Sequence, residues 1–269
     1  MWLTEQHNEF WEQGYLVTEK IAEQGDVEVY RSEKLGKVLS VDGQLRFSEG
    51  DAPAFFEMLS HVAMCSHPEV NKVLILGGGD GGVATEVLRH DDVCIDVVDA
   101  NEAVYALSKA HFDRFSGAFD HECVTFHHVE PFAFLEKAKE ESYDVILVQG
   151  EIALDEFMLA QLGRVLSKKG IIALVSANWW IDAEALKTTL ALLSEKFGVV
   201  MPYRYEGYSH AGFGGMMIIA SRTYHPTADI ILQKSDLLDD LKYYSCDVHM
   251  AAFALPAAMR QELYPVMKI

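Results

Sequence analysis

Between residues 72 and 221 the chain alternates short apolar runs with amphipathic stretches, and this alternation constrains the fold more than any other feature. The apolar runs contain few polar residues, which is typical of parallel strands covered by helices on both faces. The sequence therefore predicts an α/β, Rossmann-like parallel sheet domain, in which ligands bind beyond the carboxyl ends of the strands. The expected strands are KVLILG (72–77), CIDVVDA (94–100), VTFHHVE (124–130), YDVILVQ (143–149) and GIIALVSA (170–177).

Helical spacing of apolar residues fills the intervals between these strands. The clearest case is DEFMLAQLGRVLSKK (155–169), which we expect to be one helix ended by Gly170. Two further apolar runs, VVMPYRY (199–205) and GGMMIIASR (214–222), are expected to close the sheet as an antiparallel pair. The order of strands and helices places all of this in one large domain.

Before Pro53 the apolar residues recur at every second position, as in β-strands. Four short segments alternate apolar and polar residues and are separated by glycine-containing turns, which predicts a small antiparallel sheet. From Pro53 the apolar residues fall at helical spacing as far as His67. We therefore expect a small N-terminal β-sheet domain over residues 1–52 and a Rossmann-like catalytic domain over residues 53–269.

The chain is acidic, with 41 Asp and Glu against 22 Lys and Arg and a formal net charge of −19. Nucleic acid is not expected as a partner, because phosphate binding needs clustered basic residues. An acidic field attracts cationic substrates, although acidity also serves solubility alone. The four cysteines form no CxxC pair, so neither a disulfide framework nor a metal site is expected. No signal peptide and no apolar run of about 20 residues is present, and we expect a cytoplasmic protein.

A glycine-rich turn, Gly77 to Gly82, follows the strand KVLIL and opens the next helix. Gly77, Gly79 and Gly82 have the G-x-G-x-x-G spacing that binds nucleotides when a strand precedes it and a helix follows. Five glycines in six residues are costly in chain entropy, which favours close approach of a ligand over a plain tight turn.

Asp80 decides between the ligands that such a turn can bind. It lies where a dinucleotide would place its pyrophosphate, and a carboxylate repels a diphosphate but attracts an ammonium or sulfonium group. Asp99 ends the next strand, where a carboxylate accepts hydrogen bonds from ribose hydroxyls. Glu130, after the third strand, is the candidate for the adenosine end. These residues favour a sulfonium nucleoside of the S-adenosylmethionine type.

The segment around this turn resembles the central signature of the spermidine synthases, the polyamine aminopropyltransferases. The similarity rests on VDGQLRFSEGDAPAFFEMLSHVAMCSHPEVNKVLILGGGDGGVATEVLRH (41–90), on LKYYSCDVHMAAFALP (241–256) and on the opening Trp2-x-x-Glu5. It implies a transferase of polyamine biosynthesis that moves the aminopropyl group of decarboxylated S-adenosylmethionine to putrescine, giving spermidine and methylthioadenosine. A homodimer without a metal is implied too.

By the same resemblance, Gly77, Gly79, Asp80, Asp99, Glu130 and Gln149 bind the donor nucleoside. Asp80 would hold the aminopropyl ammonium, Asp99 the ribose and Glu130 the adenosine portion. The deprotonated amine attacks the carbon beside the sulfonium, so alignment supplies much of the rate.

The sequence departs from the family in the half of the site that would bind the amine. Where the family has Asp-Ser-Ser/Thr-Asp-Pro, this chain has Gln149-Gly150-Glu151-Ile152. An amide cannot act as a base, so Glu151 is the expected catalytic base and amine ligand. A family glutamine is replaced by Arg46, although Gln44 is close, and a Tyr-His pair by Phe55-Phe56.

Aromatic faces bind ammonium groups, so aromatic residues could compensate for the lost carboxylates. Trp179 and Tyr208, with Phe55, are the candidate amine-binding residues, while core packing is the competing interpretation for Trp179. Two other functions stay open at this point. One is a methyltransferase-like enzyme that uses S-adenosylmethionine, and the other is a non-catalytic homologue that binds the nucleoside.

Overall fold

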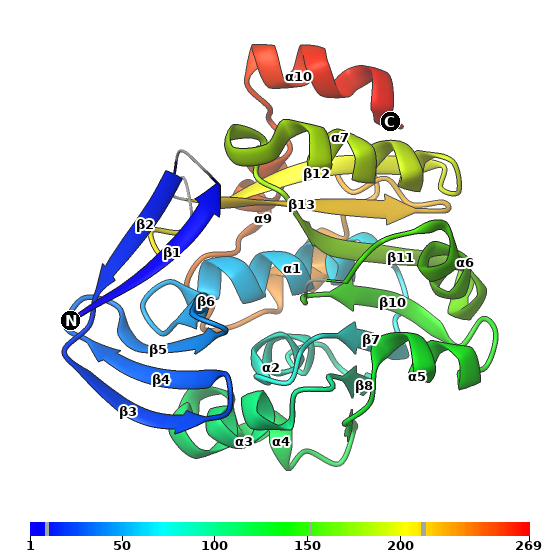
Figure 1. Ribbon diagram of the computed structural model, residues 1–269. Helices are drawn as coiled ribbons and strands as arrows, with labels where there is room; N and C mark the ends of the chain where they lie inside the picture. The colour runs from blue at the N-terminus through cyan, green and yellow to red at the C-terminus, as the bar shows by residue number, and fades with distance from the viewer. Residues whose placement is uncertain (9–10, 151, 211–213) are drawn as a thin grey trace.

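The computed structural model describes residues 1–8, 11–150, 152–210 and 214–269, and Figure 1 shows their arrangement. The N-terminal part forms two antiparallel sheets. The first pairs β1 (Trp2–Asn8) with β2 (Trp11–Leu16), and the second has the order β3-β4-β5-β6. The strands of the second sheet are β3 (Glu19–Gln24), β4 (Val27–Ser32), β5 (Gly36–Val41) and β6 (Gln44–Ser48).

The rest of the chain builds a seven-stranded sheet of order β12-β13-β11-β10-β7-β8-β9. Strands β11, β10, β7, β8 and β9 are parallel, whereas β13 and β12 run antiparallel at one edge. The strands are β7 (Lys72–Leu76), β8 (Cys94–Val98), β9 (Val124–His127), β10 (Tyr143–Val148), β11 (Leu166–Ser176), β12 (Val199–Glu206) and β13 (Gly214–Ser221). The predicted Rossmann-like domain preceded by a small antiparallel β domain is confirmed.

Helices cover both faces of the large sheet (Figure 1). On one face α1 (Ala52–Ser66), which is buried along its whole length, packs with α2 (Gly82–Val87), α3 (Glu102–His111), α4 (Ser116–Phe119) and α9 (Cys246–Ala252). On the other face lie α5 (Pro131–Lys137), α6 (Glu156–Val165), α7 (Trp179–Ser194) and α10 (Ala257–Leu263). The remaining elements are η1 (Asp113–Phe115), α8 (Leu232–Asp236) and η3 (Tyr264–Val266).

One face of the four-stranded sheet packs into the core around α1, while Tyr30 and Val38 on its other face belong to a separate buried cluster with β1 and β2. Its inward residues Val27, Val29, Leu39 and Phe47 belong to the same buried cluster as α1. The Phe47 ring meets Phe56 of α1 edge to face, with 5.4 Å between centroids. The N-terminal strands are therefore fixed against the helix that precedes the glycine turn, so they can form one wall of a site there.

Helix α6 is shorter than the sequence predicts. The chain becomes extended at Leu166, so residues 166–169 belong to β11 and the predicted helix up to Lys169 is wrong. The backbone N–H groups of Glu141 and Ser142 bond the carbonyls of Arg164 and Val165, which turns the chain into the sheet. These donors come from a loop more than 20 residues earlier, outside any local pattern.

The C-terminal segment is tied back to α1 and to the sheet edge. Glu57 of α1 is fully buried and accepts the backbone N–H groups of Lys242, Tyr243 and Tyr244. Lys268 exchanges two backbone hydrogen bonds with Val200 on the edge strand β12. No helix in the described ranges combines the length and apolar character that crossing a membrane requires.

Candidate active site

The glycine turn joins the end of β7 to the start of α2, and its glycines are required by space. Gly77 and Gly81 have φ angles of 76° and 79°, which only glycine adopts readily. A Cβ on Gly77 would lie 2.6 Å from the backbone of Gly150, beyond the end of β10. The ends of these neighbouring strands therefore approach each other closely enough that no side chain fits between them.

Asp99, just beyond the end of β8, holds the turn from the other side. Its Oδ2 accepts the N–H of Gly79 at 2.9 Å, and its Oδ1 accepts the N–H of Asn101 at 3.0 Å. A Cβ on Gly79 would lie only 2.8 Å from Asp99 Oδ2. The carboxylate is partly exposed, and its remaining lone pairs can accept hydrogen bonds from hydroxyl groups of a ligand.

Asp80 is fully buried within the turn. Its Oδ1 accepts the N–H of Gly82 at 2.9 Å, and its Oδ2 accepts Arg46 Nε at 3.2 Å and Gln149 Nε2. Burial raises the pKa of Asp80 above its ordinary value, although the Arg46 guanidinium and the Gly82 N–H oppose this rise. Asp80 is thus a buried carboxylate, and one of its hydrogen-bond partners is a cationic side chain of the protein itself, Arg46.

Gln149 lies directly after β10 and lines the same space. Its amide orientation is set by Asp80, because only the Nε2 end can donate to a carboxylate. The Oε1 end is therefore directed elsewhere, and it is buried without a hydrogen-bond partner among the described residues. A buried acceptor left unpaired costs about 1–3 kcal/mol, so an N–H or O–H donor from a ligand or a water would stabilise the site there.

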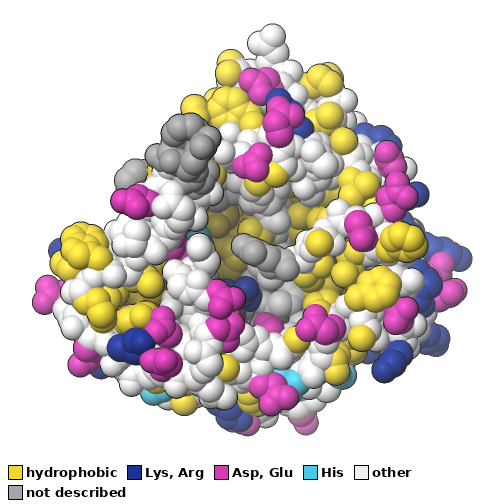
Figure 2. Space-filling model, in the orientation of Figure 1, with side chains coloured by type: hydrophobic (Ala, Val, Ile, Leu, Met, Phe, Trp, Pro, Cys, Tyr) yellow, Lys and Arg dark blue, Asp and Glu magenta, His cyan; other side chains and the backbone are white. Residues whose placement is uncertain are grey.

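A cavity of about 460 Å³ opens between the N-terminal strands and the carboxyl ends of the large sheet. Figure 2 shows that this face of the molecule is hollowed. The charged or titratable residues among its lining are Glu5, His7, Asp42, Arg46, Tyr205 and His210. Phe55 of α1 stacks on His210 at 5.6 Å and meets Tyr205 edge to face at 5.8 Å, which makes one wall aromatic.

The wall formed by β1 carries a second buried carboxylate. Glu5 is 4% exposed and accepts hydrogen bonds from the Tyr15 hydroxyl at 2.8 Å and from the backbone N–H of Leu45. Burial raises the pKa of Glu5, and these two bonds oppose the rise. His7 Nε2 lies 3.6 Å from the Glu5 carboxylate, and burial lowers the pKa of His7. Glu5 therefore lines the cavity itself, whereas Asp80 lies behind the opposite wall, where it contacts the lining residues Arg46 and Gln149.

Glu130 is exposed and precedes α5, where it lines another cavity of about 320 Å³. The other residues of this cavity include Pro131, Phe132, Ile152 and Met158. Glu130 is thus near the carboxyl ends of the strands, but it does not line the cavity that Gln149 and Arg46 share.

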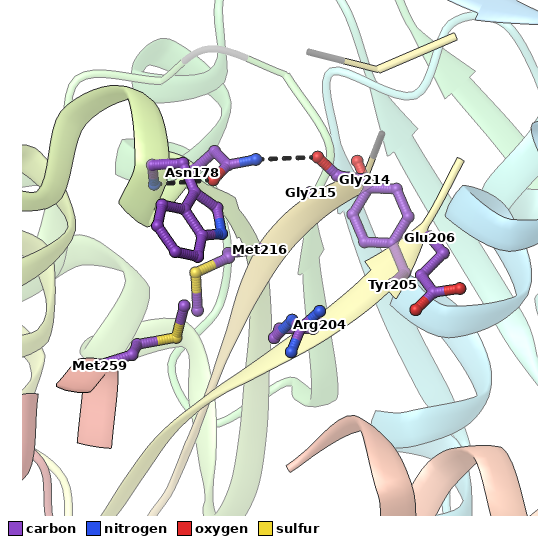
Figure 3. A pocket seen from close by; sticks show the side chains of 9 residues that line it. Asn178, Arg204, Tyr205, Glu206, Gly214, Gly215, Met216 and Met259 are labelled. Carbon is purple, nitrogen blue, oxygen red and sulfur yellow. Dashed lines mark hydrogen bonds between the residues drawn. The ribbon is translucent and has the colours of Figure 1, made fainter. Parts of the chain in front are cut away.

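A smaller cavity of about 270 Å³ adjoins the large one and shares Asn178, Tyr205, Gly214 and Gly215 with it. Asn178 Nδ2 donates to the Gly214 carbonyl at 2.9 Å across this shared wall (Figure 3). In the same view Arg204 and Glu206 of β12 lie opposite Met216 and Met259. Because the two cavities share these four residues, the large cavity adjoins the smaller one where β13 begins, at Gly214 and Gly215.

Two aromatic residues expected at the amine are placed elsewhere. Trp179 begins α7, packs against the buried cluster on the α6 and α7 face, and contacts Trp180 at 4.6 Å between ring centroids. Tyr208 is 47% exposed and directs its hydroxyl toward Gly50. Neither lines the large cavity, and Glu151 lies outside the described residues.

Sequence reasoning did not select His7, Tyr205 or His210 as site residues. For Tyr205 a signal was present, since strand alternation in VVMPYRY puts Tyr203 and Tyr205 on the same, buried face. His7 and His210 come from segments about 200 residues apart and carry no such pattern. Within the described ranges, no three or more His, Cys, Asp and Glu side chains group closely enough to hold a metal ion.

The glycine turn, with Asp80 and Asp99 just beyond the ends of β7 and β8, has the arrangement of a Rossmann-like ligand-binding site. Comparison with known proteins narrows the class, because residues 53–226 match the spermine/spermidine synthase domain family. The chain is 31% identical over 255 residues to a spermine synthase of Arabidopsis thaliana, covering 88% of this chain and 71% of that one. It is 30% identical over 261 residues to a polyamine aminopropyltransferase of Clostridium acetobutylicum, covering 93% and 91%.

Two solved structures that resemble this chain come from the same family as these sequence relatives. A spermidine synthase in complex with the transition-state analogue AdoDATO matches with a TM-score of 0.93 at 25% identity, covering 98% of this chain and 95% of that one. The spermidine synthase from Thermotoga maritima matches with a TM-score of 0.92 at 26% identity, covering 98% and 94%. The chain belongs to the spermine/spermidine synthase family, and the predicted transferase class is confirmed.

Proposed function

We propose that this enzyme moves the aminopropyl group of decarboxylated S-adenosylmethionine to putrescine, giving spermidine and methylthioadenosine. The observation that carries the proposal is Asp80, a fully buried carboxylate in the glycine turn that contacts two residues lining a cavity with an acidic far wall. A buried carboxylate at this position favours a cationic ligand over a phosphate.

The donor is assigned to the edge of the sheet where the glycine turn lies. Asp99, held by Gly79 and Asn101, would accept the ribose hydroxyls. Glu130 would contact the adenosine portion. The aminopropyl ammonium would donate to Asp80 and to the unpaired Oε1 of Gln149. These contacts hold the carbon beside the sulfonium at the mouth of the large cavity.

The acceptor is assigned to the large cavity. A diamine carries two positive charges at pH 7, and the chain's net charge of −19 raises the local concentration of such cations. Glu5 and Asp42 lie on the wall away from the large sheet, where they would bind the distant ammonium. Trp179 and Tyr208 remain predictions for the amine, although their side chains do not line this cavity.

Transfer requires the acceptor amine to lose a proton before it attacks. The amine nitrogen then forms a bond to the carbon, while the carbon–sulfur bond breaks and its electron pair neutralises the sulfonium. Gln149 cannot take the proton, because an amide is not a base at this pH. We assign that role to Glu151, two residues beyond Gln149 and next to Gly150, whose backbone lies against Gly77.

Release of methylthioadenosine tests the reaction. Purified protein is incubated with decarboxylated S-adenosylmethionine and a panel of diamines, and the released nucleoside is followed chromatographically. Release with putrescine supports the proposal, and release only with another amine changes the acceptor. Methyl transfer from S-adenosylmethionine without such release would assign a methyltransferase-like function, and binding without turnover a non-catalytic one.

Glu151→Gln tests the assignment of the base. The variant should lose at least about 100-fold in turnover, since general-base catalysis contributes about 10²–10⁴-fold, while donor affinity stays within about threefold. Glu156→Gln, an exposed carboxylate in the first turn of α6, is the matched control and should turn over normally. Normal turnover by Glu151→Gln would remove Glu151 from the mechanism.

We also propose that the enzyme is cytoplasmic, because its cysteines form no CxxC pair and no apolar run reaches about 20 residues, and that it is a homodimer, as the resemblance to its family implies. Sedimentation equilibrium of the purified chain would measure the assembly directly. A mass equal to the single-chain value of 30.1 kDa over the micromolar range would contradict the dimer.

A further inference from the structure

Tyr15 of β2 is a buried tyrosine for which the proposed transfer needs no direct role. Its hydroxyl oxygen lies 2.8 Å from Glu5 Oε2 and 2.7 Å from the carbonyl oxygen of Ser209. Glu5 and Ser209 are buried as well. Tyr15 thus connects the carboxyl group on the β1 wall of the large cavity with the segment after β12 that carries His210.

The number of available protons decides how Tyr15 makes these two contacts. A tyrosine hydroxyl has one proton to donate, whereas a carbonyl oxygen and an ionised carboxylate can only accept. With Glu5 ionised, one proton would face two acceptors, and at least one of the contacts would lack a full hydrogen bond. With Glu5 protonated, Glu5 donates to Tyr15 and Tyr15 donates to Ser209, so both contacts are hydrogen bonds of ordinary length.

The two carboxyl oxygens of Glu5 have different surroundings, and these fit the protonated form. Oε1 accepts the backbone N–H of Leu45, so Oε2 is the oxygen left to carry a proton toward Tyr15. Burial also raises the pKa of Glu5, although the bonds to Leu45 and Tyr15 oppose the rise. The hydrogen-bond count and the effect of burial therefore agree on the protonation state of Glu5 in the free enzyme.

The titratable groups around Glu5 do not supply a positive charge. His7, on the same strand, places its Nε2 3.6 Å from the carboxyl group, but burial lowers the pKa of His7 and keeps its ring neutral at pH 7. His210 follows β12, and burial lowers its pKa too, although the Asp51 carboxylate opposes this. Asp51 itself accepts the backbone N–H of Ser209 and adds a negative charge there.

The remaining charged or titratable residues that line the cavity are Asp42, Arg46 and Tyr205. Asp42, in the turn between β5 and β6, is another carboxylate, and burial raises the pKa of Tyr205 and keeps it neutral. The Arg46 Nε bonds Asp80 instead of Glu5. In the described part of the chain no Lys or Arg pairs with Glu5, so the acceptor's ammonium is the cation that would favour its ionised form.

We infer that Glu5 holds a proton in the free enzyme and loses it when the distant ammonium of the acceptor binds, with Tyr15 as the positioning residue that keeps this proton in place. The inference rests on the proposed function, which assigns that ammonium to Glu5. In the exchange the Glu5 O–H bond breaks, the carboxylate accepts an N–H of the ammonium, and the released proton passes to solvent water. Acceptor binding is then coupled to proton release and weakens in acid.

Isothermal titration with putrescine counts the released protons. The protein is first saturated with methylthioadenosine, which lacks the aminopropyl group and so cannot react, and the titration is repeated at pH 7 in buffers of different ionisation enthalpy. Wild-type protein should release about one proton more per bound putrescine than Glu5→Gln, whose amide has no acidic proton to lose. Equal proton counts in the two proteins overturn the inference, because Glu5 would then not change its protonation.

The pH dependence of the KM for putrescine tests the role of Tyr15. In wild type this KM should rise as pH falls, by about tenfold for each pH unit in which Glu5 must first lose a proton. Glu5→Gln should raise KM about ten- to a hundredfold at pH 7 and should lack this rise. Tyr15→Phe removes the acceptor of the Glu5 proton, so the rise should begin about one pH unit lower, while kcat stays within about threefold. A rise that begins at the same or a higher pH overturns the inference, because Tyr15 would then not hold the proton on Glu5.

Tyr30→Phe is the matched control. Tyr30 belongs to the same buried cluster as Tyr15 and also bonds a glutamate, Glu28, at 2.8 Å, but it does not line the large cavity. This variant should change neither the proton count nor the KM. In Tyr15→Phe the segment at Ser209 keeps its place, because Asp51 accepts both the backbone N–H and the hydroxyl of Ser209.

Methylthioadenosine release from decarboxylated S-adenosylmethionine separates this inference from the function on which it rests. Release with putrescine, together with equal proton counts in wild type and Glu5→Gln, refutes the inference and leaves the proposed function intact. No release with any amine refutes the proposed function, whereas the putrescine titrations still decide whether Glu5 loses a proton. Failure of putrescine to bind overturns the inference as well, since its ammonium is the group that displaces the proton.

Discussion

Asp80→Asn tests whether the Asp80 carboxylate contributes more to the affinity for the donor than to the stability of the fold. The carboxylate is fully buried, and its raised pKa means that the fold disfavours the ionised form. A raised carboxyl pKa stabilises the folded state below the unfolded pKa, and this contribution is lost as pH rises through the folded value. At neutral pH the charge at Asp80 therefore does not stabilise the empty enzyme.

Asparagine keeps the shape of the side chain and removes the charge. Loss of its partner leaves Arg46 on a cavity wall with 21% exposure, where the guanidinium can turn toward water and retain its bond to the Gly77 carbonyl. We expect the free energy of unfolding to fall by about 1–3 kcal/mol, because one amide oxygen cannot accept all three donors that the carboxylate accepts, from Gly82, Arg46 and Gln149. Donor binding should lose about 2–3 kcal/mol, which is about a 30- to 150-fold rise in Kd, because the ammonium loses a charged acceptor.

The two quantities are measured by urea unfolding and by isothermal titration with decarboxylated S-adenosylmethionine. Asp96→Asn is the matched control on β8. Asp96 accepts bonds from Lys72 and the Tyr143 hydroxyl, each at 2.8 Å, and from His127 at 2.9 Å. It should lose about 2–3 kcal/mol of stability and keep its donor affinity. A folded Asp80→Asn protein with wild-type Kd would refute the role of Asp80.

Three further predictions address the turn, the C-terminal segment and acid stability. Gly79→Ala places a Cβ 2.8 Å from the Asp99 carboxylate and should weaken donor binding at least about tenfold, as measured by isothermal titration. Gly117→Ala is the control and should leave donor binding unchanged, because its Cβ would meet nothing within 4 Å. Glu57→Ala leaves three backbone N–H groups without their acceptor, and the free energy of unfolding should fall by about 3 kcal/mol in urea titrations; an unchanged midpoint would contradict this. Burial raises the pKa of Asp96, but the hydrogen bonds to its carboxylate outweigh burial and lower the pKa overall. The stability that Asp96 contributes is therefore present above the unfolded pKa and is lost in acid. Asp96→Asn should show a flatter profile of stability against pH than wild type below about pH 4.

The fold was largely predictable because its main signals are local. A strand buried on both faces needs only a run of apolar residues, and each helix between strands shows its own spacing. The end of α6 was missed because it depends on N–H groups of Glu141 and Ser142, which reach the helix from a distant loop. No pattern within residues 155–169 records that contact.

The residues of the candidate site also fall into two groups: those that the sequence predicts and those that only the tertiary structure brings together. Asp80 and Asp99 were predictable as neighbours, since each lies just past the end of one of two adjacent parallel strands. Glu5, Tyr205 and His210 come together only because the N-terminal strands pack across the end of the large sheet. The pairing of Arg46 with Asp80 is of this second kind, since 34 residues and a whole helix separate them. A sequence pattern shows the substitution at Arg46 but not the partner of its side chain.

The edge of the large sheet also bears on how copies of this enzyme can assemble. Val200 exchanges both backbone hydrogen bonds with Lys268, so its polar groups point away from β13. Two residues further along β12, Pro202 points the same way and has no N–H to offer. A neighbouring chain cannot continue the ladder past these residues, which protects the molecule from growing into open-ended sheets. A dimer of this enzyme must therefore use a surface other than the β12 edge around Val200 and Pro202.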